Sequence, residues 1–207
     1  MGRRHRTPIL LLLAVISFIA FVYFARFDRR YSAVEAGAPG ARGLRVVLVT
    51  LDTLRFDSFR GGDGRSSQMP MMAARAARGA VWDRCFSSTS STQPTHATLF
   101  TGLHPWQHGV SRNGQILDAR HRTVAEVFRH AGFHTVAVVG SFPVTRHFGF
   151  GKGFDEFDDS LDRGSPGPVF DVDPEEQRHY RLADAVTSAA VARLAGDTAR
   201  RQFYWVH

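Results

Sequence analysis

Residues 44–52 read LRVVLVTLD, a continuous β-branched and apolar run that ends in a carboxylate. A strand with one solvated face alternates apolar and polar side chains, whereas a strand buried on both faces of a parallel sheet is apolar throughout. We therefore predict a buried parallel strand here. Its terminal residue, Asp52, stands where open α/β sheets gather their functional groups, at the carboxyl end of a strand.

A capped helix followed by a second strand is the clearest local signal. Thr123 and Glu126 form a capping box at the start of an apolar helical face, and Gly132 is placed to end that helix. The next residues, HTVAVVG, are again apolar and β-branched. They predict a second buried strand over residues 134–140.

The same alternation continues to the end of the chain. Residues 69–79 predict a short helix, and residues 171–196 predict a long helix capped by Asp173. The aromatic run QFYWVH, residues 202–207, predicts a third strand. Strands that alternate with helices indicate an α/β fold, a three-layer sandwich with a mostly parallel central sheet.

The positive charge of the chain is concentrated at its N-terminus. The formal net charge is +7, and six arginines against Asp28 in the first 30 residues account for +5 of it. The remaining +2 is spread over the other residues. No cluster of basic residues interleaved with aromatic residues occurs among them. Nucleic-acid-binding proteins carry such a patch, so we expect no nucleic-acid partner.

An uncharged apolar segment, TPILLLLAVISFIAFVYFA, runs from Thr7 to Ala25. As a helix rising about 1.5 Å per residue, it is just long enough to cross a hydrocarbon core of about 30 Å. It predicts an uncleaved signal anchor, with a cleaved signal peptide as the alternative. We expect a cytoplasmic basic N-terminus (1–7), a transmembrane signal anchor (8–25), a juxtamembrane linker (26–43) and an extracytoplasmic domain, periplasmic or at the cell surface (44–207).

The third predicted strand runs into the end of the chain at His207. An α/β domain that ended on a central strand would lack the neighbours of that strand. We therefore expect residues 44–207 to be the N-terminal portion of an incomplete domain, part of a longer protein. This fragment alone is expected to be inactive.

The stretch STSSTQPTHATLFTG concentrates hydroxyl side chains at the start of a helix pattern. Pro94 suits a first helical turn, which makes Thr92 or Gln93 the cap, and Gly102 suits the end of the helix. A hydroxyl at a helix N-terminus lies among unpaired N–H groups, a setting suited to a tetrahedral anion. Thr92 is then a nucleophile activated by a divalent cation, or a simple cap. His96 is a substrate-facing donor or a surface histidine.

Asp52 leaves a similar choice open, between a ligand for a hard divalent cation and a turn cap. Several motifs in series bear on both choices: VVLVTLDTLRFDSF, MPMMAARAARGAVWDRCFSSTSSTQPTHATLFTGLHPWQHGV, TVAEVFRHAGFHTVAVVG and GFGKGFDEFDDS. Together they resemble the N-terminal half of the sulfatase family, within the alkaline-phosphatase-like superfamily of metallohydrolases and transferases. The resemblance extends from Arg45 to Ser160.

This resemblance implies a role for three residues. Asp52 falls on the family's first metal-binding aspartate. The nucleophile motif of the family is Cys or Ser, any residue, Pro, any residue, Arg, and it falls on residues 92–96. Thr92 thereby takes the position of the metal-bound nucleophile, and His96 that of the supporting arginine. The implied cofactor is a divalent metal ion, calcium first, with manganese, zinc or magnesium as alternatives.

The sequence also departs from the family pattern. Most sulfatases convert the Cys or Ser of the motif to formylglycine, and Thr92 cannot become that aldehyde. Cys85, seven residues upstream, lacks the Pro and Arg spacing. Thr53 stands in place of the family's second aspartate. The later Lys and His motif is not clear in GSFPVTRHFGFGK, so His147 and Lys152 receive no role.

Three functions follow from these matches and departures. The first is a membrane-anchored, sulfatase-like metal-dependent hydrolase of sulfate or phosphate esters that uses a metal-bound Thr92. The second is a phosphoethanolamine or phosphoglycerol type transferase acting at the membrane, since those enzymes resemble this chain in their threonine nucleophile. The third is a degenerate, non-catalytic domain, which Thr53 and His96 favour.

The other reactive groups are interpreted as structural. The single cysteine, Cys85, is expected to be a buried, inert thiol. The acidic run DEFDDSLD, residues 155–162, is expected to be a solvated turn, because it lacks the glycine and the final glutamate of a twelve-residue calcium loop. The remaining histidines are expected to be structural or surface residues: His104, His108, His121, His130, His134 and His179.

Overall fold

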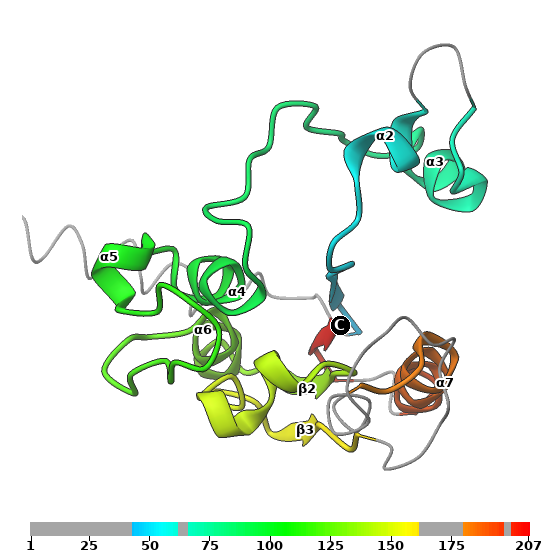
Figure 1. Cartoon of the computed structure of the whole chain (residues 1–207). Helices are drawn as coiled ribbons and strands as arrows, with labels where there is room; N and C mark the ends of the chain where they lie inside the picture. The colour runs from blue at the N-terminus through cyan, green and yellow to red at the C-terminus, as the bar shows by residue number, and fades with distance from the viewer. Residues whose placement is uncertain (1–42, 62–65, 162–179, 197–199) are drawn as a thin grey trace, which may run out of the picture.

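The computed structural model describes residues 43–61, 66–161, 180–196 and 200–207 (Figure 1). Four strands form one parallel sheet in the order β1-β4-β2-β3. The expected α/β fold with a parallel central sheet is therefore confirmed. The strands are β1 Arg45–Val49, β2 His134–Val138, β3 Glu156–Asp158 and β4 Gln202–Val206.

Helices cover both faces of this sheet (Figure 1). Helices α4 (Thr92–Thr101) and α6 (Val124–His130) lie over one face, and α7 (Ala183–Leu194) lies over the other. Successive residues of β2 point to opposite faces, so that Ala137 belongs to the larger apolar core and Val138 to the smaller. The smaller core contains Val138, Val186 and Ala190; the larger one includes Ala97, Phe100, Ala125, Phe150, Phe154, Phe203 and Trp205.

Trp205 of β4 lies at the centre of the larger core and is fully buried. The ring of Phe100, from α4, packs edge-on against it at a centroid distance of 4.5 Å. Aromatic side chains bury the largest apolar area per residue, so this contact fixes α4 on the sheet. The start of α4, which carries Thr92, is thereby held near the carboxyl end of β4.

The capping box predicted for α6 is confirmed. The Thr123 hydroxyl accepts a hydrogen bond from the Glu126 N–H at 3.2 Å, and the Glu126 carboxylate accepts one from the Thr123 N–H at 2.9 Å. The Thr123 hydroxyl also donates to the Lys152 carbonyl at 3.0 Å. The cap therefore ties the start of α6 to the loop before β3.

The remaining helices are short. The helix expected over residues 69–79 is present as α3, with Pro70 as its first residue. Helices α2 and α3 lie away from the sheet in Figure 1. The bounds are α2 Phe56–Arg60, α3 Pro70–Ala76, α5 Pro105–His108, and the 3-10 segments η1 Phe142–Val144 and η2 Arg146–Phe148.

Two expectations about strands are corrected. β1 pairs only with β4 in the described part of the sheet, and its Val47 and Val49 are 44% and 57% exposed, so β1 is not buried on both faces. The acidic run over 155–162 is not simply a solvated turn, because its residues 156–158 form β3 and pair with β2. An edge strand can carry charged side chains, so β3 lacks the apolar pattern by which the other strands were predicted.

The long helix expected over residues 171–196 is described only from Ala183. Tyr180 forms an isolated antiparallel bridge with Ser141, and Leu182 has extended backbone angles. Residues 180–182 are therefore not helical, and α7 starts at Ala183, later than the predicted helix. Asp173, predicted as that cap, lies outside the described residues.

Within the described ranges, no helix is long and apolar enough to cross a membrane. The predicted anchor (8–25), the basic segment before it and nearly all of the linker (26–43) lie outside those ranges. Their assignment stays a prediction.

Candidate active site

Asp52 and Thr92 meet at the carboxyl edge of the sheet. Asp52 follows the end of β1, and Thr92 is the first residue of α4. The Thr92 hydroxyl donates a hydrogen bond to the Asp52 carboxylate at 2.8 Å, across 40 residues of sequence. The two residues that the sequence selected for metal binding and nucleophilic attack are thus in direct contact.

The turn after Asp52 has an unusual backbone. Thr53 has a φ of 55°, the one positive value at a non-glycine residue in the described part of the chain. Its N–H donates to the second carboxylate oxygen of Asp52 at 3.0 Å. Left-handed backbone at such a residue is uncommon and often marks a functional turn, and here it holds the carboxylate toward α4.

The start of α4 is fixed by amide side chains from other segments. The cap was expected at Thr92 or Gln93, but it is Ser91. Thr92 is therefore the first helical residue. Asn113 accepts the Gln93 N–H through its side-chain oxygen at 2.9 Å, which satisfies a donor that helix starts leave unpaired. The helix ends, as predicted, at Gly102, whose φ is 69°.

Gln93 is fully buried beneath the nucleophile position. Its amide nitrogen donates to the Pro143 carbonyl at 2.8 Å, and its amide oxygen accepts the Gln115 N–H at 3.2 Å. A buried side chain with both partners satisfied is held in one orientation. Gln93 therefore fixes the first turn of α4 to two other segments.

His96 lies one turn after Thr92 and is only 4% exposed. Its Nδ1–H donates to the Thr92 carbonyl at 2.8 Å, while its Nε2 is buried with no hydrogen-bond partner. Burial lowers the pKa of His96 below its ordinary value, because desolvation penalises the charged imidazolium. His96 is consequently a neutral, buried group, neither the surface residue nor the cation that an arginine would be.

His207 is a site residue that the sequence reasoning missed. Its ring packs edge-on against the His96 ring at a centroid distance of 4.7 Å, and its Nδ1 lies 2.7 Å from the Thr50 hydroxyl. Trp205 donates to the same hydroxyl at 3.0 Å. Burial, followed by the neighbouring His96, lowers the pKa of His207 to about 4. It directly follows β4, whose last residue Val206 pairs with Val49 of β1, so it lies opposite Thr50, and no periodic pattern in the sequence marked it.

A pocket of about 390 Å³ opens beside this pair. It extends from the segment after β1 to the hydroxyl-rich segment before α4. Among its walls are Thr50, Asp52, Thr53, Ser87, Thr89, Ser90, Ser91, Thr95 and His96. An anion placed next to Thr92 would therefore be surrounded mainly by hydroxyl groups.

The donor set of this edge suits a hard divalent cation in kind. A carboxylate and a hydroxyl oxygen are the ligand types that calcium, magnesium and manganese prefer. Asp52 is exposed, so its carboxylate is accessible to an ion. Among the described residues, however, no group of three or more His, Cys, Asp or Glu side chains is arranged to hold a metal. Asp52 and Thr92 are two of the ligands that such a site requires.

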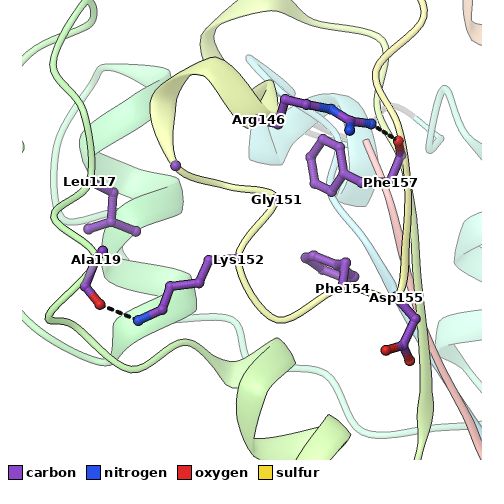
Figure 2. A pocket seen from close by; sticks show the side chains of 9 residues that line it. Leu117, Ala119, Arg146, Gly151, Lys152, Phe154, Asp155 and Phe157 are labelled. Carbon is purple, nitrogen blue, oxygen red and sulfur yellow. Dashed lines mark hydrogen bonds between the residues drawn. The ribbon is translucent and has the colours of Figure 1, made fainter.

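Other candidate groups are engaged elsewhere. Figure 2 shows the Lys152 amine donating to the Ala119 carbonyl, in the wall of a separate pocket of about 400 Å³. Lys152 also pairs with Glu126 at 3.2 Å, which makes it a structural residue. The His147 ring packs edge-on against Phe148 at 4.7 Å. Cys85 was expected to be buried, but it is exposed.

The described site is thus a parallel α/β sheet with a carboxylate and a helix-start hydroxyl in contact at its carboxyl edge. A family model described as Sulfatase matches residues 45–207. The chain belongs to the sulfatase family. No curated protein matches the sequence significantly.

Solved structures agree with this assignment at the level of the fold. BT4656, in complex with its substrate D-glucosamine-2-N,6-O-disulfate, is 18% identical with a TM-score of 0.57, covering 80% of this chain and 34% of its own. The phosphonate monoester hydrolase of Agrobacterium radiobacter is 22% identical with a TM-score of 0.57, covering 79% and 40%. BT1596, a 2-O GAG sulfatase, is 20% identical with a TM-score of 0.53, covering 79% and 34%. The chain thus spans roughly a third to two fifths of these proteins.

Proposed function

We propose that the full-length protein containing this chain hydrolyses sulfate or phosphate esters, with Thr92 as the nucleophile. The observation that carries this proposal is the 2.8 Å hydrogen bond from the Thr92 hydroxyl to Asp52 at the carboxyl edge of the sheet. Membership of the sulfatase family supports ester hydrolysis. The names of two similar structures, a 2-O GAG sulfatase and a phosphonate monoester hydrolase, support sulfur or phosphorus as the electrophile.

The reaction takes place in two displacements. The Thr92 oxygen forms a bond to the sulfur or phosphorus atom, and the bond from that atom to the ester oxygen breaks. The hydroxyl proton, which the carboxylate of Asp52 holds in its hydrogen bond, is passed to the departing alcohol. Water then attacks the covalent Thr92 ester, which returns the hydroxyl and releases sulfate or phosphate.

Asp52 and Thr92 are the residues that would hold a divalent cation, with calcium proposed first. When bound, such an ion supplies Lewis-acid stabilisation of the ester oxygens and lowers the pKa of the hydroxyl. The buried Gln93 and the Asn113 cap keep the Thr92 side chain in place relative to Asp52. Since His96 is neutral, it stabilises the backbone of Thr92 and adds no positive charge.

The experiment that tests the proposal replaces the nucleophile. Thr92→Ala in the full-length protein is expected to lower kcat by at least 1,000-fold, in the range seen when a covalent nucleophile is removed. Thr101→Ala, at the other end of α4, is the matched control, because Thr101 bonds only within its own helix end. Turnover of p-nitrophenyl sulfate or phosphate esters that survives in the Thr92 variant would exclude Thr92 as the nucleophile.

A transferase is the second candidate. Two sequence observations favour it: a threonine at the nucleophile position and the apolar run from Thr7 to Ala25, which would hold the enzyme at its lipid donor. A transferase would pass the same covalent group from Thr92 to an acceptor alcohol in place of water. Radiolabelled headgroup appearing in a sugar or lipid acceptor would establish it, whereas release of the label only as a free anion would exclude it.

A further inference from the structure

Thr50 and His207 lie beside each other at the ends of two neighbouring strands. Leu48 of β1 pairs with Trp205 of β4, and both side chains pack in the larger core. The ladder continues for one more bond, from the Thr50 N–H to the Val206 carbonyl at 3.0 Å. Because side chains two residues apart lie on the same face of a strand, Thr50 and His207 lie on the face that these two core side chains occupy. This is the face of the sheet that α4 covers.

The Thr50 hydroxyl joins two side chains at the end of β4. The indole N–H of Trp205, which can only donate, lies 3.0 Å from the Thr50 oxygen, and Nδ1 of His207 lies 2.7 Å from it. Burial lowers the pKa of His207 to about 4, so its ring is neutral at pH 7 and one ring nitrogen lacks a proton. If that nitrogen is Nδ1, the hydroxyl accepts from the indole with a lone pair and donates its own proton to the imidazole. The pairing that satisfies the hydroxyl therefore has Thr50 donating to His207, with the imidazole proton on Nε2.

The His207 ring in turn supports His96. The two rings pack edge to face, at a centroid distance of 4.7 Å and an interplanar angle of 87°. The His96 Nδ1–H donates to the Thr92 carbonyl at 2.8 Å, while its Nε2 has no hydrogen-bond partner among the described residues. One hydrogen bond and contacts with the rings of His207 and Trp205 therefore orient this buried imidazole. A shift of the His207 ring would be passed on to the backbone of Thr92.

These contacts close on themselves at Asp52. The Thr92 hydroxyl donates to the Asp52 carboxylate at 2.8 Å, and Asp52 is two residues after Thr50. The closed set of contacts, here called the contact ring, runs in order through Thr50, His207, His96, Thr92 and Asp52. A side chain that packing and hydrogen bonds hold on several sides keeps the geometry that a reaction needs. All five residues lie within the described ranges, so the contact ring is complete within this chain.

We infer that Thr50 is a positioning residue: its hydroxyl, acting through the two histidines, fixes the Thr92 hydroxyl against the Asp52 carboxylate. This inference rests on the proposed function and adds a residue to it. Among the described residues, the Thr50 hydroxyl bonds only to Trp205 and His207, so Thr50 acts through its neighbours and not on the substrate. The contact ring passes on position and not charge, because burial lowers the pKa of both imidazoles and keeps them neutral at pH 7.

Substitutions of Thr50 in the full-length protein test this role. Thr50→Val keeps the branched shape and removes the hydroxyl; we expect kcat to fall about 10- to 100-fold, since a misplacement of about 1 Å can cost about 100-fold. KM should stay within about twofold, because an interaction that acts only on the reacting geometry changes kcat. Thr50→Ser restores the hydroxyl and should keep kcat within about threefold of the unchanged protein. Thr101→Val, at the other end of α4, is the matched control and should change neither constant.

Steady-state kinetics with p-nitrophenyl sulfate and p-nitrophenyl phosphate provide both constants. Unchanged kcat in Thr50→Val overturns the inference. An equal loss in Thr50→Ser also overturns it, because the hydroxyl is then not the cause, and so does a change that is confined to KM. Turnover that survives in Thr92→Ala overturns the proposed function instead, and the contact ring is then tested by the tautomer of His207 alone.

A second variant removes the same link and leaves the indole of Trp205 paired. His207→Phe keeps a ring against His96 but offers the Thr50 hydroxyl no acceptor, so we expect a loss of kcat similar to that of Thr50→Val. The double variant should lose no more than about threefold beyond either single variant, because both changes break one path. Unchanged kcat in His207→Phe, or losses that multiply, would overturn the inference. Thermal unfolding shows whether each variant is folded, and His207→Phe decides the question if Thr50→Val is not, since Thr50→Val leaves the buried indole N–H unpaired.

Nitrogen NMR of the full-length protein with isotope-labelled histidine rings provides a readout that does not need turnover. At pH 7 we expect the proton of His207 on Nε2 and that of His96 on Nδ1, with the His207 signals identified by their absence from His207→Phe. Thr50→Val should shift His207 toward the other tautomer, because the donor to its Nδ1 is gone, while Thr101→Val should leave it unchanged. A proton on Nδ1 of His207 in the unchanged protein, or no response to Thr50→Val, would overturn the inference.

Discussion

At the scale of single residues, the site depends on contacts between side chains that are far apart in the sequence. Asp52 and Thr92 could be selected from the sequence because each follows a clear signal: the end of an apolar strand and the start of a proline-marked helix. His207 and Asn113 could not, because a lone histidine after a strand and an asparagine in a loop carry no periodic pattern. The sheet order places His207 beside the segment after β1, and the fold of the 102–123 segment brings Asn113 to the start of α4.

The metal ligand proposed at Asp52 leads to a residue-scale prediction. Asp52→Asn keeps the shape of the side chain and removes its charge, so calcium affinity should fall at least tenfold, since hard cations bind carboxylates through that charge. Calorimetric titration of the full-length protein with calcium measures the effect. Asp57→Asn, in the exposed ion pair with Arg55, is the control. Unchanged calcium affinity in the Asp52 variant would remove Asp52 from the metal site.

The contact between the buried His96 and the partly buried His207 predicts a pH dependence of stability. The pKa of His207 is about 4 in the folded chain, against an ordinary value of 6.5, so the unfolded chain binds more protons between those values. The free energy of unfolding should therefore fall as the pH drops from about 6.5 to about 4, by about 3 kcal/mol for this group. The lowered pKa of His96 acts in the same direction.

Urea unfolding of the chain at several pH values measures this slope. His207→Gln should flatten the slope between pH 6.5 and 4, because the titrating group is gone. His130→Gln changes an exposed histidine of α6 and is the matched control. A slope in the His207 variant as steep as that of the unchanged chain would show that His207 does not titrate in this window.

At the scale of elements, local signals predicted β2, β4 and α6 well. Their patterns are self-contained: apolar β-branched runs for the strands, and a capping box with an apolar face for the helix. β3 and the bend before α7 were missed for a shared reason. Both depend on a partner that lies elsewhere in the chain, β2 for β3 and Ser141 for Tyr180.

The proposed catalysis depends on the position of α4, and a Gln93 variant tests that dependence. Gln93→Ala leaves the partly buried Pro143 carbonyl and Gln115 N–H without partners, which should destabilise the fold by about 1–3 kcal/mol. It should also lower kcat more than it raises KM, since the Thr92 side chain shifts. Gln68→Ala, at an exposed glutamine before α3, should change neither quantity. Thermal unfolding and steady-state kinetics provide both readouts, and unchanged kcat in the Gln93 variant would contradict the positioning role.

At the scale of the whole molecule, the order of strands and helices was predictable, but the sheet order was not. Alternating β and α segments require a parallel sheet with helices on both faces, which the structure confirms. Whether β4 lies between β1 and β2 depends on which side chains fill the core together. Here Trp205 of β4 packs against Phe100 of α4, and no local sequence pattern predicts this contact.

The proposed membrane anchor is also a property of the whole chain. If residues 8–25 span a bilayer, the full-length protein should remain in the membrane pellet after extraction with alkaline carbonate. Replacing Leu12 and Ile16 with Asp should release it, because each buried carboxylate costs about 2.5–3.5 kcal/mol at the centre of a membrane helix. The unchanged protein appearing in the soluble fraction would contradict the anchor.

The central claim is that the Thr92 oxygen becomes covalently attached to the substrate's sulfur or phosphorus atom. Rapid acid quenching of the full-length protein during turnover, followed by mass spectrometry of the peptide that contains residues 88–102, tests it directly. The account predicts a mass increase on Thr92 equal to the mass of the transferred group. This modified peptide should appear before steady state and should be absent from the Thr92→Ala protein. An unmodified peptide under rapid turnover, or the added mass on another residue, would contradict it.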